Sequence, residues 1–163
     1  MTTVTKTGDL LTSDAEIICQ QVNCLGVMGA GLAKQIRDTY PEVFAEYMKF
    51  CTGREPCDLL GKAQIVQASK YKVCNIFGQA GVRKQPGQQC TVYAALNRAF
   101  ASLKDYCLEN GISSIAVPYG MGCGLGGGDW DVVWANIYDA FEDTNVEIQI
   151  WRYDNGTACN TVL

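Results

Sequence analysis

The 163-residue chain contains no histidine. This absence excludes Ser-His and Cys-His nucleophilic pairs, histidine proton relays and every zinc site with a histidine ligand. The sequence also lacks an apolar run of the ~18 residues that a membrane span requires. The segment after Met1 has no apolar stretch typical of a signal peptide. We therefore expect a cytoplasmic protein that makes no contact with membranes.

Charged side chains are few, at 18% of the residues, with 13 basic and 17 acidic groups and a net charge of −4. This balance argues against broad electrostatic binding to nucleic acid, although a local basic patch is compatible with it. Apolar residues make up 48% of the chain, which is enough for a sizeable core in a single domain.

Nine cysteines are scattered along the chain without a CxxC pair. Their odd number, and the position of several inside apolar runs, favour reduced and mostly buried thiols over a disulfide framework. The same lack of ligand spacing disfavours a zinc site built from thiolates alone. We expect no metal and no cofactor.

Strand-like and helix-like patterns alternate along the chain without a linker. Strands are predicted at 4–7, 16–23, 63–67, 72–77, 114–118 and 146–151, and helices at 29–39, 41–50, 91–109 and from Asp129 onward. The helix at 91–109 has an apolar face that is predicted to begin at Val92. Strands 63–67 and 72–77 form a predicted hairpin, which makes the sheet mixed. About six strands interleaved with helices predict a three-layer α/β/α domain over residues 1–154, followed by a polar tail at 155–163.

Two glycine-rich loops each follow a predicted buried strand and precede a helix. The first is Asn23-Cys-Leu-Gly26-Val-Met-Gly29-Ala-Gly31-Leu-Ala33, and the second runs from Pro118 to Gly128. Glycine lets the backbone approach a ligand closely, and free N–H groups at a helix start attract phosphate oxygens. At the carboxyl ends of adjacent strands, two such loops would hold a diphosphate from both sides. Tight turns and helix caps are the alternative explanation. Neither loop carries a Walker motif or Gly-x-Gly-x-x-Gly, so P-loop ATP hydrolysis and nicotinamide binding are not supported.

Four motifs, in this order, resemble those of macrodomains, and within that family the branch of the terminal ADP-ribose protein glycohydrolases and the chromatin-remodeller macrodomains. They are Gly8-Asp9-Leu10, Gln21-Val22-Asn23, Gly26-Val-Met-Gly-Ala-Gly-Leu-Ala33 and Gly122-Cys-Gly-Leu-Gly-Gly-Gly-Asp-Trp130. The similarity covers about residues 4–152 and implies the three-layer macrodomain fold with a pocket for ADP-ribose.

The resemblance assigns ligand contacts to individual positions. Asp9, with Leu10 beside it, would accept the adenine amino group, and Asn23 would hydrogen-bond the distal ribose. Trp151, with Tyr153 as second choice, would cover the adenine. For Asp9 and Asn23 a turn or cap role is the alternative, and for the two aromatic residues it is core or surface packing. The diphosphate and distal ribose would lie against the backbone of two further sets, Val27, Met28, Gly29, Ala30, Gly31, Leu32 and Ala33, and Gly122, Cys123, Gly124, Leu125 and Gly126.

The chain departs from the hydrolytic members that it resembles at two positions. Those proteins carry a lysine after the second hairpin strand and an aspartate in the second glycine loop. Here Gly78 or Gln79 stands at the lysine position, and Gly126 stands at the aspartate position. Lys84 lies on a following loop, where a solvated side chain is favoured over a catalytic one. The catalytic residues are therefore unknown, and Asn23, acting through a positioned water, is the remaining candidate.

The expected function is binding of ADP-ribose or its derivatives, with hydrolysis of ADP-ribose 1''-phosphate or of an ADP-ribosyl linkage left open. The alternatives are a non-catalytic reader of ADP-ribosylated protein, or a binder of another adenine nucleotide or a terminal RNA phosphate. The expected partner is ADP-ribose or an ADP-ribosylated macromolecule. Nucleic acid is not expected, apart from an ADP-ribosylated end.

Overall fold

A computed structural model describes residues 1–153 of the chain. The predicted tail at 155–163 lies outside the described residues. The strands are β1 (Thr2–Thr7), β2 (Ile17–Asn23), β3 (Ala63–Gln67), β4 (Lys72–Gln79), β5 (Ser114–Pro118) and β6 (Glu147–Arg152). The helices are α1 (Gly31–Thr39), α2 (Pro41–Cys51), α3 (Pro56–Leu59), α4 (Tyr93–Asn110) and α5 (Trp130–Phe141), with one 3-10 turn, η1 (Leu10–Thr12).

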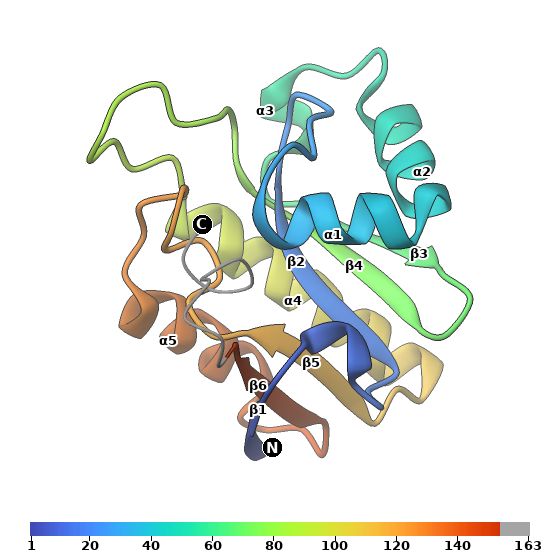
Figure 1. The fold of residues 1–163 in the computed structure, drawn as a ribbon. Coiled ribbons are helices and arrows are strands. Elements are labelled where there is room, and N and C mark those ends of the chain that lie inside the picture. Colours follow the sequence, from blue (N-terminus) through green and yellow to red (C-terminus); the bar gives the residue numbers. More distant parts are fainter. Residues whose placement is uncertain (154–163) are drawn as a thin grey trace.

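The six strands form one mixed sheet in the order β1-β6-β5-β2-β4-β3 (Figure 1). β3 runs antiparallel to β4, and every other neighbouring pair is parallel. Helices α1 and α2 cover one face of the sheet, and α4 and α5 cover the other (Figure 1). The mixed sheet and the three-layer α/β/α architecture predicted from the sequence are confirmed. Within residues 1–153, no helix is both long and apolar enough to cross a membrane.

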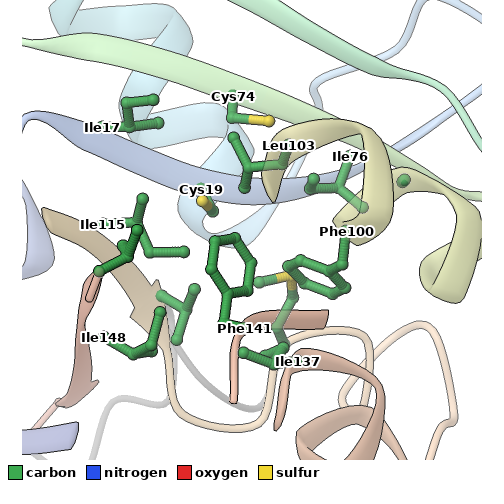
Figure 2. Packing of buried hydrophobic residues seen from close by; sticks show 14 of the residues in the cluster. Ile17, Cys19, Cys74, Ile76, Phe100, Leu103, Ile115, Ile137, Phe141 and Ile148 are labelled. Atoms are coloured by element: carbon green, nitrogen blue, oxygen red, sulfur yellow. The ribbon is translucent and has the colours of Figure 1, made fainter. Parts of the chain in front are cut away.

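Strand β2 lies at the centre of the core and is buried on both faces. Ile17 and Cys19 pack with Phe100 of α4 and Phe141 of α5 in the larger apolar cluster (Figure 2). Ile18, which alternation along the strand directs to the opposite face, packs with residues of α1 instead. Burial on both faces explains the apolar run of Ile17, Ile18 and Cys19 at the start of this strand.

The apolar periodicity of α4 correctly predicts its buried face, but not where the helix begins. Leu96, Phe100 and Leu103 are fully buried, and the helix ends at Gly111, whose φ of 65° is left-handed. Val92 does not belong to the buried face. It is the residue before the first helical turn and is 37% exposed, because Thr91 pairs with Gln79 in an isolated bridge that holds this segment extended.

Helix α1 also starts later than predicted. Ala30 is extended, with φ of −148° and ψ of 164°, and Gly31 follows with φ of 58°. The expected helical residues at 29 and 30 therefore remain part of the first glycine loop. The elements α3 and η1 were not predicted, since single turns are too short to show a periodic pattern.

The eight described cysteines are all free thiols, and Cys159 lies outside the described residues. Four of them are buried, and Cys57 is exposed. Cys19 and Cys74 are paired in register on neighbouring strands, and the hydrogen bond with Cys74, together with burial, raises the pKa of the Cys19 thiol.

Candidate functional site

A cavity of about 320 Å³ lies between the carboxyl ends of β2 and β5. These strands pair only through Ile17–Ile115 and Ile18–Ala116, so beyond Ile18 the β5 side of β2 is left unpaired, while β2 stays paired with β4 up to Asn23. The chain continues from β5 toward one sheet edge and from β2 toward the other, so the strand order reverses here. Ligands of open α/β sheets bind at such switch points.

Three segments supply the lining. They are the end of β2 with the loop after it and the start of α1, the end of β5 with the loop after it, and the end of β4 with the residues that follow it. Of the predicted contacts, those that line the cavity are Asn23, Val27, Gly29, Ala30, Leu32, Ala33, Gly122, Gly124, Leu125 and Gly126. The lining residues that sequence reasoning did not assign are Gln20, Gln21, Val22, Gln79, Val82, Arg83, Pro118, Gly120 and Met121.

The predicted contacts Met28, Gly31 and Cys123 belong to the two glycine loops but are not part of the lining. Met28 is 1% exposed and packs with Tyr47 in the apolar cluster under α2, so its side chain anchors the first loop. Burial, with a smaller contribution from Asp129, raises the pKa of the Cys123 thiol to about 11. This thiol is therefore protonated near neutral pH.

Asn23 holds the first glycine loop in place with its side chain. Its Oδ1 accepts from the backbone N–H of Leu25 at 2.9 Å and of Val27 at 3.4 Å, and its Nδ2 donates to the Val27 carbonyl at 2.8 Å. The buried Tyr47 hydroxyl lies 2.9 Å from the same Oδ1. The turn-stabilising role is thus present in the structure, and among the described partners one Nδ2 hydrogen is left for the ribose contact that the resemblance implies.

The second glycine loop is closed by hydrogen bonds to its own carbonyls. The Gly122 carbonyl accepts from the Gly128 N–H at 2.9 Å and from the Thr91 hydroxyl at 2.7 Å. The Gly126 carbonyl accepts from the N–H groups of Cys90 and Thr91 at 2.7 and 2.9 Å. A Cβ on Gly126 would lie 2.4 Å from Thr91 Oγ1 and 2.5 Å from the Gly122 oxygen, so this position excludes any side chain.

A glutamine beneath the second loop connects it to β4. Gln21 Nε2 donates to Gln79 Oε1 at 2.8 Å and to Thr91 Oγ1 at 2.9 Å. Gln79 Nε2 donates in turn to the Gly81 carbonyl at 2.8 Å. Gln79 is one of the two residues at the lysine position of the resembled hydrolases. Both the oxygen and the nitrogen of its side-chain amide therefore already form hydrogen bonds within the protein.

Arg83 is the only ionisable side chain in the described lining, and no carboxylate, lysine or cysteine accompanies it there. The Cys24 thiol lies near the first loop, but burial raises its pKa to about 11. The cavity therefore combines backbone donors with one cation, and it holds no charged base or thiolate near neutral pH. This combination suits a bound anion better than acid–base catalysis.

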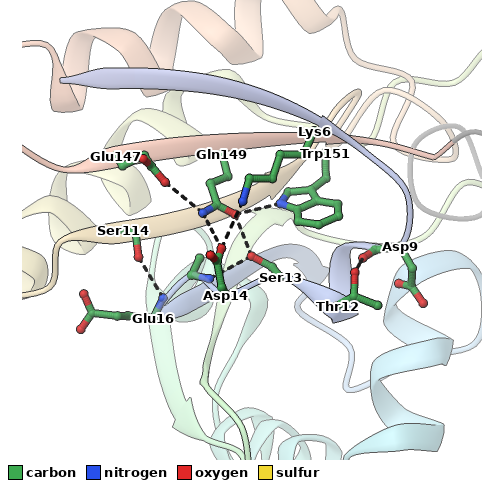
Figure 3. Close-up of polar contacts among 11 residues, drawn as sticks. Lys6, Asp9, Thr12, Ser13, Asp14, Glu16, Ser114, Glu147, Gln149 and Trp151 are labelled. Atoms are coloured by element: carbon green, nitrogen blue, oxygen red, sulfur yellow. Dashed lines mark hydrogen bonds and ion pairs between the residues drawn. The ribbon is translucent and has the colours of Figure 1, made fainter.

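Asp9, Leu10, Trp151 and Tyr153 lie outside the cavity lining, at the β1–β6 side of the molecule. Asp9 Oδ1 accepts from the Leu11 N–H at 2.9 Å and so caps η1. The Trp151 indole is only 8% exposed, and its Nε1 donates to Gln149 Oε1 at 3.1 Å (Figure 3). The adenine contacts assigned to these four residues stay predictions.

The Trp151 ring is held by a polar network centred on Gln149 (Figure 3). Gln149 Oε1 also accepts from the Ser13 hydroxyl at 2.8 Å, and its Nε2 donates to Asp14 at 2.9 Å. Lys6 pairs with Asp14 and lies 5.7 Å from the centre of the Trp151 ring. Several polar contacts therefore fix the position of the Trp151 side chain. Within residues 1–153, no group of three potential ligand side chains could hold a metal ion.

The family model described as Macro domain matches residues 19–137. A Mycobacterium tuberculosis protein named DNA ADP-ribosyl glycohydrolase is 34% identical over 138 residues, which cover 83% of this chain and 37% of that relative. The solved macrodomain of Mycobacterium tuberculosis DarG superimposes with a TM-score of 0.78 at 30% identity, covering 91% of this chain and 96% of the other. Thermosipho africanus DarTG in complex with ADP-ribose shares the fold, with a TM-score of 0.74 at 21% identity, covering 91% of this chain and 41% of the other.

Proposed function

Since the chain belongs to the Macro domain family, we propose that its cavity binds ADP-ribose, either free or as the ADP-ribosyl group of a macromolecule. The observation that carries this proposal is the pairing of two glycine loops with a single cation at a strand-order reversal. A diphosphate carries two negative charges, and it is bound by backbone N–H groups together with arginine.

The sheet order indicates how ADP-ribose is oriented in the cavity. Asp9 and Trp151 lie by β1 and β6, whereas Gln79 ends β4 on the other side of β2. We place the adenine toward Asp9, the diphosphate between the loops, and the distal ribose near Asn23 and Gln21. In this orientation the distal ribose lies closest to the segment that follows β4.

Calorimetric titration with ADP-ribose tests the proposal. We expect one site per chain with a Kd in the micromolar range, or roughly −7 to −8 kcal/mol. AMP should bind far more weakly, because it lacks the distal ribose and the second phosphate. Absence of binding heat with ADP-ribose, or equal affinity for AMP, would contradict the proposed function.

A second candidate function is hydrolysis of an ADP-ribosyl linkage or of ADP-ribose 1''-phosphate, which is favoured by the glycohydrolase name of the Mycobacterium tuberculosis relative. The lysine route is disfavoured, because the Gln79 amide nitrogen is not nucleophilic and Gly126 offers no carboxylate. Turnover would then have to use a water held near Asn23 and the ligand's own phosphate.

A mass-spectrometric time course on glutamate-modified protein, together with a phosphate-release assay on ADP-ribose 1''-phosphate, separates binding from turnover. We expect little or no release of ADP-ribose from the glutamate ester. Rapid release that stops in Lys84→Ala, with a borohydride-trapped adduct only when the lysine is present, would instead assign lysine chemistry to that residue.

A further inference from the structure

A row of four aromatic side chains, here named the α5 row, follows helix α5 from its start toward its end. Its members are Tyr119, Trp130, Trp134 and Tyr138. Neighbouring ring centres along the row are 5.0, 6.2 and 6.5 Å apart. The three helical members lie four residues apart, so they share one side of α5. The row is therefore a continuous aromatic surface along this helix.

The core uses only part of the α5 row. Tyr119, Trp130 and Trp134 are partly buried and pack against the larger apolar cluster. Tyr138 is 45% exposed, so nearly half of this side chain stays in water. An aromatic ring in that position adds little to the core, but its free surface is available to a partner.

Acidic side chains border the row on its solvent side. Asp131 lies three residues before Trp134, and Glu142 lies four residues after Tyr138, so each is a neighbour of one ring on the helix surface. Both acidic residues are exposed, and among the described residues neither forms an ion pair. The N-terminal ammonium lies at this end of α5, but it donates to backbone carbonyls, one of them that of Glu142. The two carboxylates are therefore available to cations from outside.

The protein itself shows how the row binds a cation. The Arg152 guanidinium lies 3.7 Å from the centre of the Tyr119 ring, at one end of the row. Guanidinium groups stack on aromatic faces, where the ring attracts the positive charge. Within residues 1–153, no lysine or arginine lies over the rings of Trp130, Trp134 or Tyr138. These three rings therefore offer the same kind of contact to the cations of a partner.

The spacing of the rings fits an extended peptide. Ring centres are 6.2 Å apart between Trp130 and Trp134 and 6.5 Å apart between Trp134 and Tyr138. In an extended segment, side chains on one side recur every second residue, at about 6.6 Å. Cationic side chains at alternate positions of such a segment would thus meet successive rings.

A separate partner fits this surface better than a second copy of the chain. Residues 105–151, which include α5, contain eight acidic residues and no basic one, whereas the basic residues of 59–104 lie elsewhere on the chain. Contact between these two regions of different copies would join unlike surfaces head to tail. Such contacts close only into rings or continue as open filaments.

We propose that the α5 row binds an extended segment of another protein that carries arginine or lysine at alternate positions. The cations of this segment stack on Trp134 and Tyr138, and the carboxylates of Asp131 and Glu142 pair with them. The rings fix the spacing of the cations, and the carboxylates supply the charge. No member of the row lines the cavity, so this surface acts independently of ADP-ribose.

Two peptides of equal composition and charge test the spacing. Both are capped at their ends and carry a fluorescent label, one with the sequence Arg-Ala-Arg-Ala-Arg-Ala-Ala and the other with Arg-Ala-Ala-Arg-Ala-Ala-Arg. Only the first places neighbouring arginines on the same side of an extended chain. By fluorescence anisotropy at low ionic strength, we expect the alternating peptide to bind at least about threefold more tightly, with an affinity that falls as salt is added.

Substitutions separate the ring contacts from the charge contacts. Tyr138→Ala should weaken binding of the alternating peptide roughly three- to fivefold, whereas Tyr138→Phe keeps the ring and should bind within about twofold of the unmodified protein. Asp131→Asn and Glu142→Gln should each weaken it roughly twofold. Glu46→Gln is the matched control, because Glu46 is an exposed carboxylate on α2, across the sheet from α5 (Figure 1). Unchanged melting midpoints verify that each variant is folded.

Two kinds of outcome would overturn the proposal. Equal affinity for the two peptides, or unchanged binding in Tyr138→Ala, would mean that only diffuse negative charge attracts them. Concentration-dependent association of the protein in sedimentation velocity, abolished by Tyr138→Ala, would assign the row to a second copy instead. Neither result bears on ADP-ribose binding, because the row and the cavity lining share no residue.

Discussion

At Gly126, atoms of the protein already occupy the place where a side chain would begin. Because a Cβ there would lie 2.4 Å from Thr91 Oγ1 and 2.5 Å from a backbone oxygen, Gly126→Ala must displace the loop. We expect a loss of about 1–3 kcal/mol in the free energy of unfolding and at least about tenfold weaker ADP-ribose binding. Chemical denaturation and calorimetry measure the two effects.

Gly81→Ala is the control for this substitution. A Cβ on Gly81 would meet only Leu25, at 4.0 Å, and the backbone there is not left-handed. Its stability and its affinity for free ADP-ribose should stay close to those of the unmodified protein. Equal behaviour of the two alanine variants would show that the second loop does not form the diphosphate site.

Arg83 is the single ionisable side chain among the described residues that line the cavity. Replacing it by glutamine should weaken ADP-ribose binding by about 1 kcal/mol, or roughly fivefold, since a charge-assisted hydrogen bond at an exposed position is lost. Titration at two salt concentrations should also show a smaller salt dependence for Arg83→Gln. The adjacent Lys84→Gln is the reference, and an equal loss of affinity in both would assign the effect to general loop charge.

Among the structural elements, the starts of β2 and β5 are joined by one carboxylate. Glu16 Oε1 accepts from both the N–H and the hydroxyl of Ser113 at 2.7 Å, and these bonds hold the pKa of Glu16 below its ordinary value of 4.5. A depressed folded pKa gives stability that is present above pH 4.5 and is lost as the pH falls through the folded value.

Glu16→Gln should therefore lower the free energy of unfolding at pH 7 by a small amount, of order 0.5–1 kcal/mol, because the site is exposed. The difference from the unmodified protein should shrink below pH 4. Melting curves across pH 3–7 measure it, with Glu46→Gln on α2 as an exposed control. A difference that stays constant down to pH 3 would contradict the role of the ionised carboxylate.

Sequence reasoning locates most of the elements, because burial leaves a periodic pattern in them. The buried face of α4 and the apolar start of β2 are examples. It misplaces boundaries where a tertiary contact competes with propensity, as at Thr91, which pairs with Gln79 and delays the helix. Single turns such as α3 leave no pattern at all.

The candidate site is likewise predictable from the sequence only in part. The glycine loops are visible in sequence because close packing at positions such as Gly126 leaves no room for a side chain. Arg83 gives no such signal, since an arginine in a polar loop is ordinary until the fold brings that loop against β2 and β5. The side-chain bonds of Gln21 to Gln79 and Thr91 depend likewise on residues 58 and 70 positions apart, which no local pattern reports.

For the molecule as a whole, ligand binding should appear as thermal stabilisation. A ligand at one hundred times its Kd stabilises the native state by about 2.7 kcal/mol, which is roughly 5–10 °C in a chain of this size. Differential scanning fluorimetry with ADP-ribose should show this shift, and AMP at the same concentration should give a much smaller one. Equal shifts with both would mean that the distal ribose and second phosphate contribute little.

The sheet order places β3 and β4, from a stretch at 59–104 with seven basic and no acidic residues, at one edge of the sheet (Figure 1). Most of β6 belongs to a stretch at 105–151 with eight acidic and no basic residues, and it lies toward the other edge. The charges of these two stretches favour the approach of an anion from the β3–β4 side over its approach from the β6 side. The arrangement therefore acts on the rate of productive encounter more than on the lifetime of the complex.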